Sequence, residues 1–212
     1  MWIVLVASLA LSQLPARAVE YLPVLQLVIV AAWPAMPDRA VLAGQIEQET
    51  CITLTHRSCW NPRAELKTAR EYGFGLGQIT ITSRFNTFDT VKGLDPALRG
   101  WAWADRYDPA RQIRALVALD RNLYRRFSPE DDGLAFMLSA YNGGLGGVLQ
   151  DRRLCASKPG CDPHRWFGHV ERTSYRATTK VQGYGQSFFA INRGYVRNIY
   201  QRKIKYEDAL HA

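Results

Sequence analysis

The sequence lacks the features that would define a repeat protein or a nucleic-acid-binding module. Its 212 residues contain no long block of like charge, no internal repeat, no RNA-binding signature and no zinc-finger spacing. The formal net charge of +8 suits an anionic partner, such as nucleic acid, a membrane surface or a cell-wall polymer. The positive charge is the sole feature that favours nucleic acid, and no binding motif accompanies it. We therefore expect no nucleic-acid partner. The charged stretches at 151–153 and 201–205 are short, and we interpret both as solvated surface.

No interdomain linker is evident, and the N-terminus carries no basic residue before its first apolar stretch, 2–11. That stretch is followed by Ala16-Arg17-Ala18, which is typical of a signal-peptide cleavage site. We therefore expect residues 1–18 to be a signal peptide, or alternatively an uncleaved anchor, and residues 19–212 to be one domain. The protein would be periplasmic or secreted, with possible transient membrane association through this segment. A second uncharged stretch, 21–37, contains three prolines, which favours a buried first helix over a membrane span.

Cysteine is scarce, and the four that occur form two close pairs, Cys51 with Cys59 and Cys155 with Cys161. An even number of cysteines behind a signal segment indicates disulfides formed in an oxidising compartment. We expect each disulfide to join the two cysteines of one pair. A zinc site is the alternative, because Cys161 and His164 have a Cys-x-x-His spacing, but nothing completes it at a familiar distance. We expect neither a metal nor a cofactor.

The hydrophobic pattern predicts a mainly α-helical chain. Helical spacing and start or stop signals predict helices at about 39–50, 108–127, 131–142 and 192–206. The region 51–72 is expected to be irregular, and 145–190 to be rich in loops. The glycine-rich stretch 73–82 is expected to hold a short strand or turn.

Two glutamates, Glu47 and Glu49, lie near the end of the first of these helices. Leu42, Ile46 and Glu49 fall at i, i+4 and i+7, so Glu49 continues the apolar stripe. Glu47 would point about 160° away at a hundred degrees per residue. The spacing therefore predicts that only Glu49 is on the buried face. Burial raises the pKa of a carboxyl group, and a protonated carboxyl group is what a general acid needs to break a glycosidic bond. The alternative is that both acids are solvated.

Several short motifs, in order along the chain, resemble those of the soluble lytic transglycosylase family, the goose-lysozyme-like enzymes that cleave peptidoglycan. They are Gln48-Glu49-Thr50, Trp60-Asn61-Pro62, Gly75-Leu76-Gly77-Gln78-Ile79, Ala140-Tyr141-Asn142-Gly143-Gly144 and the stretch RGYVRNIY at 193–200. Some positions depart from the family pattern: Thr50 replaces a serine, Gly77 replaces a methionine, and Leu145 stands where proline is common. These departures affect the expected substrate subsites more than the acid.

The resemblance implies a mainly α, lysozyme-like fold and a single catalytic glutamate, Glu49. It also implies that five residues contact the substrate: Thr50, Gln78, Tyr141, Asn142 and Tyr195. Three of these five residues could instead have a purely structural role. Tyr141 could be a core residue, Asn142 a helix cap and Gln78 a turn residue. The implied partner is the peptidoglycan glycan strand, and we expect a monomer.

The resemblance further implies cleavage of the β-1,4 bond between MurNAc and GlcNAc with formation of a 1,6-anhydro product. One alternative is a hydrolytic muramidase on the same fold, which would need a second acid such as Glu65, Glu71 or Asp89. Another alternative is a non-catalytic protein for wall binding or assembly. Roles in phage lysis, in a secretion system and in wall maintenance all remain open.

Overall fold

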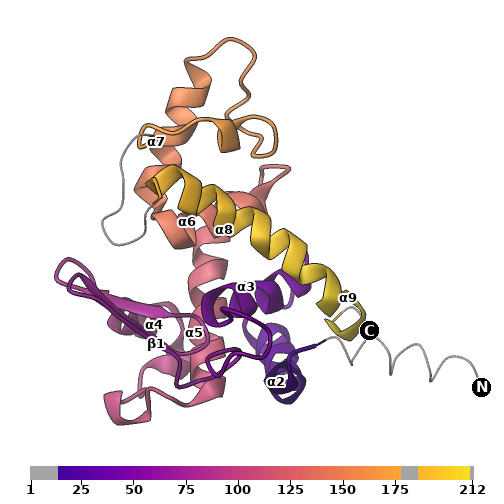
Figure 1. Cartoon of the computed structure of the whole chain (residues 1–212), viewed down its shortest axis with the longest axis vertical. Coiled ribbons are helices and arrows are strands. Elements are labelled where there is room, and N and C mark those ends of the chain that lie inside the picture. The colour runs from indigo at the N-terminus through magenta and orange to yellow at the C-terminus, as the bar shows by residue number, and fades with distance from the viewer. Residues whose placement is uncertain (1–13, 178–185, 211–212) are drawn as a thin grey trace, which may run out of the picture. The chain divides into compact units, whose positions relative to one another are not determined.

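A computed structural model describes residues 14–177 and 186–210 (Figure 1). The chain divides into two compact units. Unit 1 holds the described residues up to Leu119 together with those from Ile199 onward, and unit 2 is Asp120–Asn198. The first thirteen residues, most of the predicted signal segment, lie outside the described part of the chain. Among the described residues, none of the helices combines the length and the apolar character needed to cross a membrane.

Unit 1 combines helices with one small antiparallel sheet. Its elements are α2 (Ala16–Ala32), α3 (Ala40–Thr50), β1 (Glu65–Lys67), β2 (Glu71–Phe74), β3 (Ile79–Thr82), α4 (Thr87–Leu94), the 3-10 turns η1 (Pro96–Leu98) and η2 (Trp103–Asp105), most of α5 (Pro109–Tyr124), the end of α8 (Phe188–Lys203), η4 (Ile204–Tyr206) and α9 (Glu207–Leu210). The mainly α character is confirmed, and it is consistent with the lysozyme-like fold that the resemblance implies.

Helix α3 is enclosed on more than one face, because every residue from Ala40 to Glu47 is buried. The Asp38 carboxylate accepts a hydrogen bond from the Ala40 amide (3.1 Å) and so caps the first turn. Gly44 allows α8 to pass very close, since a Cβ atom there would lie 2.9 Å from the Ile199 carbonyl oxygen. The helix therefore lies in the interior of unit 1, and an apolar stripe does not define a single buried face.

The sheet has the order β1-β2-β3, with both neighbouring pairs antiparallel. The prediction that 51–72 is irregular is wrong at its end, where β1 and the start of β2 form. Strand β1 is exposed along its whole length and gains its order from pairing with β2, so its residues carry no apolar alternation that the sequence could reveal. The sheet, α4 and α5 share an apolar cluster: Phe74, Ile79, Phe88, Val91, Leu98, Trp101, Ala115 and Ala118.

The second uncharged stretch of the sequence begins in α2. Leu22, Leu25 and Ile29 are buried, as expected for the first helix of the domain, whereas Leu27 and Val30 are exposed. Pro23 lies inside the helix, in its second turn. Ala18, the last residue of the predicted signal peptide, is buried in the first turn of α2. The signal peptide and its cleavage stay predictions.

Unit 2 is built from the end of α5, from α6 (Gly133–Gly143), α7 (Leu145–Ala156) and η3 (Val170–Arg172), and from the first part of α8. The prediction of a loop-rich 145–190 is wrong at α7. Gly144, with φ +81°, ends α6 as predicted, but a new helix starts at once despite two glycines in its first turn. Burial of Val148, Asp151 and Cys155 stabilises a helix that local propensity disfavours.

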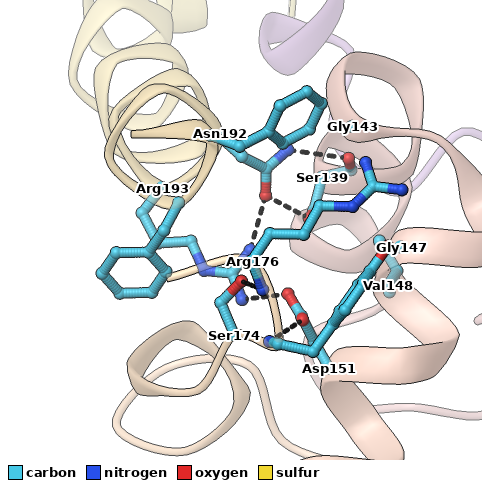
Figure 2. A pocket seen from close by; sticks show the side chains of 12 residues that line it. Ser139, Gly143, Gly147, Val148, Asp151, Ser174, Arg176, Asn192 and Arg193 are labelled. Atoms are coloured by element: carbon cyan, nitrogen blue, oxygen red, sulfur yellow. Dashed lines mark hydrogen bonds and ion pairs between the residues drawn. The ribbon is translucent and has the colours of Figure 1, made fainter. Parts of the chain in front are cut away.

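A buried ion pair organises unit 2 (Figure 2). The Arg193 guanidinium lies 2.6 Å from the Asp151 carboxylate, and both side chains are less than a tenth exposed. Arg193 also donates to the carbonyl oxygens of Val170 (3.2 Å) and Thr173. The interpretation of 151–153 as solvated surface is therefore wrong for two of its residues, because Asp151 is buried and Arg152 pairs with Glu130 at 2.6 Å, whereas Arg153 is exposed.

Candidate functional site

The structure reverses the burial predicted for the two glutamates of α3. Glu47 is completely buried, and Glu49 is partly exposed in the last turn of the helix. The prediction that Glu47 points away from the interior is wrong. It assumed that one apolar stripe marks the buried side, whereas α3 is covered on several sides. Of the two acids, Glu49 is the one that a large external substrate can reach.

The buried carboxylate of Glu47 is surrounded by donors from the C-terminal part of unit 1. The Arg202 guanidinium lies 2.7 Å from its Oε1 atom, the Lys205 ammonium lies 2.9 Å from the same atom, and the Tyr206 hydroxyl donates to Oε2. Burial, reinforced by the negative charge of Glu47, raises the pKa of Tyr206, so this phenol remains a donor. The interpretation of 201–205 as solvated surface is wrong for these two cations, which pair with an interior carboxylate.

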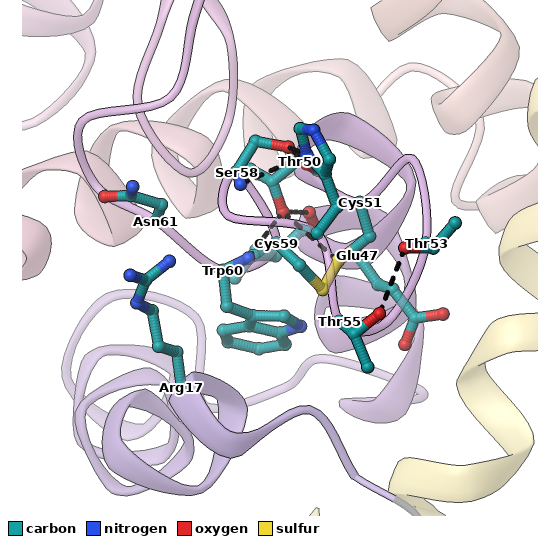
Figure 3. The surroundings of a disulfide bond; sticks show 12 residues. Arg17, Glu47, Thr50, Cys51, Thr53, Thr55, Ser58, Cys59, Trp60 and Asn61 are labelled. Carbon is teal, nitrogen blue, oxygen red and sulfur yellow. Dashed lines mark hydrogen bonds between the residues drawn. A yellow bond between two sulfur atoms is a disulfide. The ribbon is translucent and has the colours of Figure 1, made fainter.

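Thr50, which follows Glu49, is tied to the loop closed by the Cys51–Cys59 disulfide (Figure 3). Its buried hydroxyl donates to the Ile46 carbonyl oxygen (2.7 Å) and accepts from the Trp60 amide (2.9 Å). A role of Thr50 in substrate binding stays a prediction. The expected pairing of cysteines is confirmed here and at Cys155–Cys161. Because Cys161 is in a disulfide, it cannot be the zinc ligand of the alternative considered from the sequence.

Gln78 is also in unit 1, in the turn that joins β2 to β3. Its φ of +43° is unusual for a residue other than glycine, as is the φ of +50° at Trp60. The side-chain amide of Gln78 donates through Nε2 to the carbonyl oxygens of Gly75 (3.0 Å) and Ala64 (3.3 Å). Gln78 thus fills the alternative role of a turn residue, and its contact with substrate stays a prediction. Strained backbone of this kind persists where the surrounding structure fixes it, often at functional sites.

The three remaining predicted residues belong to unit 2. The rings of Tyr141 and Tyr195 are stacked, with centroids 6.5 Å apart and planes 6° from parallel. The exposed Asn142 accepts a hydrogen bond from the Asn192 amide (3.1 Å) in the last turn of α6. The structure therefore brings Tyr141 and Tyr195 together, and Tyr195 is buried whereas Tyr141 is partly exposed.

One exposed acid of unit 1, Glu65 on β1, has an organised environment. Its Oε1 atom accepts hydrogen bonds from the hydroxyls of Tyr107 and Tyr72. These two bonds, that of Tyr107 first, lower the pKa of Glu65 and keep the carboxylate ionised. By contrast the carboxylate of Asp89, also considered as a second acid, accepts a hydrogen bond from the side chain of Asn86, the cap of α4, and pairs with Lys92 at 3.0 Å.

The proteins that the chain resembles include membrane-bound lytic murein transglycosylases. No family profile matches the chain. It is 30% identical over 168 residues to the membrane-bound lytic murein transglycosylase F of Yersinia pseudotuberculosis, and the match covers 74% of this chain and 30% of that protein. The Vibrio cholerae protein of the same name is 30% identical over 151 residues, covering 67% of this chain and 24% of that protein. The chain therefore spans less than a third of the length of these relatives.

The mainly α scaffold and these relatives define the class of protein as a lysozyme-like domain related to lytic murein transglycosylases. These relatives, 30% identical over about 70% of the chain, support its assignment to the soluble lytic transglycosylase family.

The sequence did not reveal the donors around Glu47. The one sequence feature that could have indicated them is the group of cations at 201–205. Their partner Glu47 lies 155 residues before Arg202 in the chain. No local pattern connects segments that far apart, so the pairing is known only from the fold.

Proposed function

We propose that the chain is a peptidoglycan lytic transglycosylase that acts outside the cytoplasm, with Glu49 as its single general acid and base. The observation that carries the proposal is the partly exposed Glu49 in the Gln48-Glu49-Thr50 motif, at the end of a helix whose other acid is buried and ion-paired. The relatives named as lytic murein transglycosylases support the reaction class. The two disulfides support an oxidising compartment.

In the proposed reaction, protonated Glu49 donates its proton to the oxygen of the β-1,4 bond between MurNAc and GlcNAc. The bond between that oxygen and the anomeric carbon breaks, and the N-acetyl group of the MurNAc residue stabilises the positive charge that develops. The Glu49 carboxylate then accepts the proton of the 6-hydroxyl group, whose oxygen bonds to the anomeric carbon. The products are a 1,6-anhydro end and a free 4-hydroxyl, and no water is consumed. One carboxyl group returns to its starting state, so a second acid is unnecessary.

The test compares wild type with Glu49→Gln on purified peptidoglycan, using mass spectrometry of the released fragments. We expect the substitution to lower the rate at least about a hundredfold, since a positioned general acid contributes that much or more. Circular dichroism should be unchanged, because the amide has the shape of the carboxyl group. Glu20→Gln, at an exposed site on α2, is the matched control and should keep full activity. Full activity of Glu49→Gln would end the assignment.

A hydrolytic muramidase is the second candidate, and one observation favours keeping it. Glu65 is held ionised by two tyrosine hydroxyls, and a base that activates water must be ionised. The same mass spectra discriminate the two reactions, because a hydrolase leaves reducing ends and a transglycosylase leaves anhydro ends. A non-catalytic wall-binding protein would release neither product, and its affinity for peptidoglycan would be unchanged by Glu49→Gln.

A further inference from the structure

The residues on both sides of Glu49 are held by one connected set of side chains. We infer, on the basis of the proposed function, that Arg202 and Tyr206 are positioning residues for Glu49. They act through a network, here called the Glu47 network, which comprises Glu47, Gln48, Thr50, Trp60, Arg202, Lys205 and Tyr206. All of these residues belong to unit 1.

On the N-terminal side of Glu49, one guanidinium group holds two successive residues. Arg202 donates through Nη1 to Glu47 Oε1 (2.7 Å) and through Nε to Gln48 Oε1 (3.0 Å). Lys205 approaches both oxygens of Glu47, at 2.9 and 3.1 Å. The planar guanidinium has donors at fixed angles, so it fixes the direction of both side chains as well as their charge.

On the C-terminal side, the connection passes through Trp60. The Trp60 indole donates to the Tyr206 hydroxyl (3.1 Å), and that hydroxyl donates to Glu47. The Trp60 backbone amide donates to the hydroxyl of Thr50 (2.9 Å). Trp60 is completely buried and its φ is +50°, so its backbone is held in a conformation that surrounding contacts must maintain. The connection therefore runs from Glu47 through Tyr206 and Trp60 to Thr50.

The end of α8 and the following turn η4 can supply these donors because α8 is fixed against α3 at a second point. Lys203 lies 3.0 Å from the Asp38 carboxylate, which caps the other end of α3. The close approach at Gly44 lies between the two. The cations at Glu47 also lie near the C-terminal end of α3, where positive charge interacts favourably with the helix dipole. Helix α3 is thus held by the C-terminal segment at its first turn, at Gly44 and at Glu47, and Glu49 lies two residues beyond the last of these contacts.

A network of this kind affects catalysis through geometry. A general acid must lie within hydrogen-bond distance of the oxygen that it protonates, and a displacement of about 1 Å can lower the rate on the order of a hundredfold. Loosening the last turn of α3 would therefore lower kcat. It would change KM little, because Tyr206 is buried and the Arg202 guanidinium is directed at Glu47 and Gln48.

The experiment measures kcat and KM on soluble glycan fragments of peptidoglycan for wild type, Tyr206→Phe, Arg202→Met and the double variant. Tyr206→Phe keeps the ring and removes the hydroxyl that joins Glu47 to Trp60. We expect each single substitution to lower kcat about tenfold or more with KM within about twofold. Because both residues act through the same turn, the double variant should lose less than the product of the single effects.

The matched control is Thr173→Val in unit 2. It also removes a buried hydroxyl, which donates to the carbonyl oxygens of Asp151 (3.2 Å) and Val170 (3.1 Å). It should lower the melting temperature as Tyr206→Phe does and leave kcat unchanged. Unchanged kcat in Tyr206→Phe and Arg202→Met, with an active wild type and an inactive Glu49→Gln, would overturn the inference alone. An inactive wild type, or an active Glu49→Gln, would overturn the proposed function instead.

Discussion

In each unit a buried carboxylate pairs with an arginine of α8, and the two pairs differ in their access to water. In unit 2, the side chains of Asp151 and Arg193 are 6% and 7% exposed. In unit 1, Glu47 is 1% exposed, while its partners Arg202 and Lys205 are 26% and 23% exposed. The first pair is shielded on both sides, whereas the second places a buried anion against cations that reach the surface.

Because of this difference, the loss of an ion-pair partner should have different effects in the two units. Removing one member of a fully buried pair leaves an uncompensated charge in the interior, which is costly. A cation near the surface can instead turn to water when its partner is lost. The pair in unit 2 should therefore matter most for stability. The Glu47 network should matter more for the arrangement of the turn beside it.

The largest expected effect is that of Arg193→Met. It leaves Asp151 without its guanidinium partner in the interior, so we expect the free energy of unfolding to fall by about 3 to 5 kcal/mol. Urea denaturation followed by circular dichroism measures this. Arg197→Met, at an exposed position of the same helix, is the control and should change stability little. A loss below about 1 kcal/mol for Arg193→Met would mean that Asp151 reaches water after all.

A smaller effect is expected from removing each disulfide by paired serine substitutions. The two loops are similar in length, with sequence separations of 8 for Cys51–Cys59 and 6 for Cys155–Cys161. Loop closure of this size should contribute about 2 to 3 kcal/mol in either case. Only the loss of Cys51–Cys59, which follows Thr50 directly, should also lower the rate of peptidoglycan cleavage. Equal losses of activity in the two variants would contradict this distinction.

The smallest expected change in stability is that of Glu47→Gln, at about 1 to 2 kcal/mol. The amide keeps an acceptor for Tyr206, and the two cations can rehydrate. Its measurement under the conditions used for Arg193→Met gives the comparison directly. If the two substitutions cost the same, exposure of the cations does not decide the energetics.

The sequence predicted the elements that depend on local pattern. The helices at α3, α5 and α6 and the turn at 73–82 follow from periodicity, capping and glycine, and both disulfides follow from cysteine spacing. It failed where tertiary contacts decide. Helix α7 forms in a glycine-rich stretch because one side of it is buried, and β1 forms because β2 pairs with it. The role of Glu47 was misjudged because a helical wheel assumes one buried face.

The candidate acid itself was found through the motif that contains it, which no periodicity argument would have supplied. The helical wheel selected Glu49 for burial, and in the structure Glu47 is the buried acid and Glu49 is partly exposed. The motif and the helical wheel both selected Glu49, but for different reasons. The structure contradicts the argument from the wheel and leaves the argument from the motif unaffected.

The separation of 155 residues between Glu47 and Arg202 has a consequence for the order of events during synthesis. The ribosome completes the Gln48-Glu49-Thr50 motif early, but the chain segment that fastens it emerges only after Tyr206 has been translated. A nascent or truncated chain would carry every residue needed for bond cleavage and still lack their final alignment. Under the proposed function, full activity would then require the segment through Tyr206.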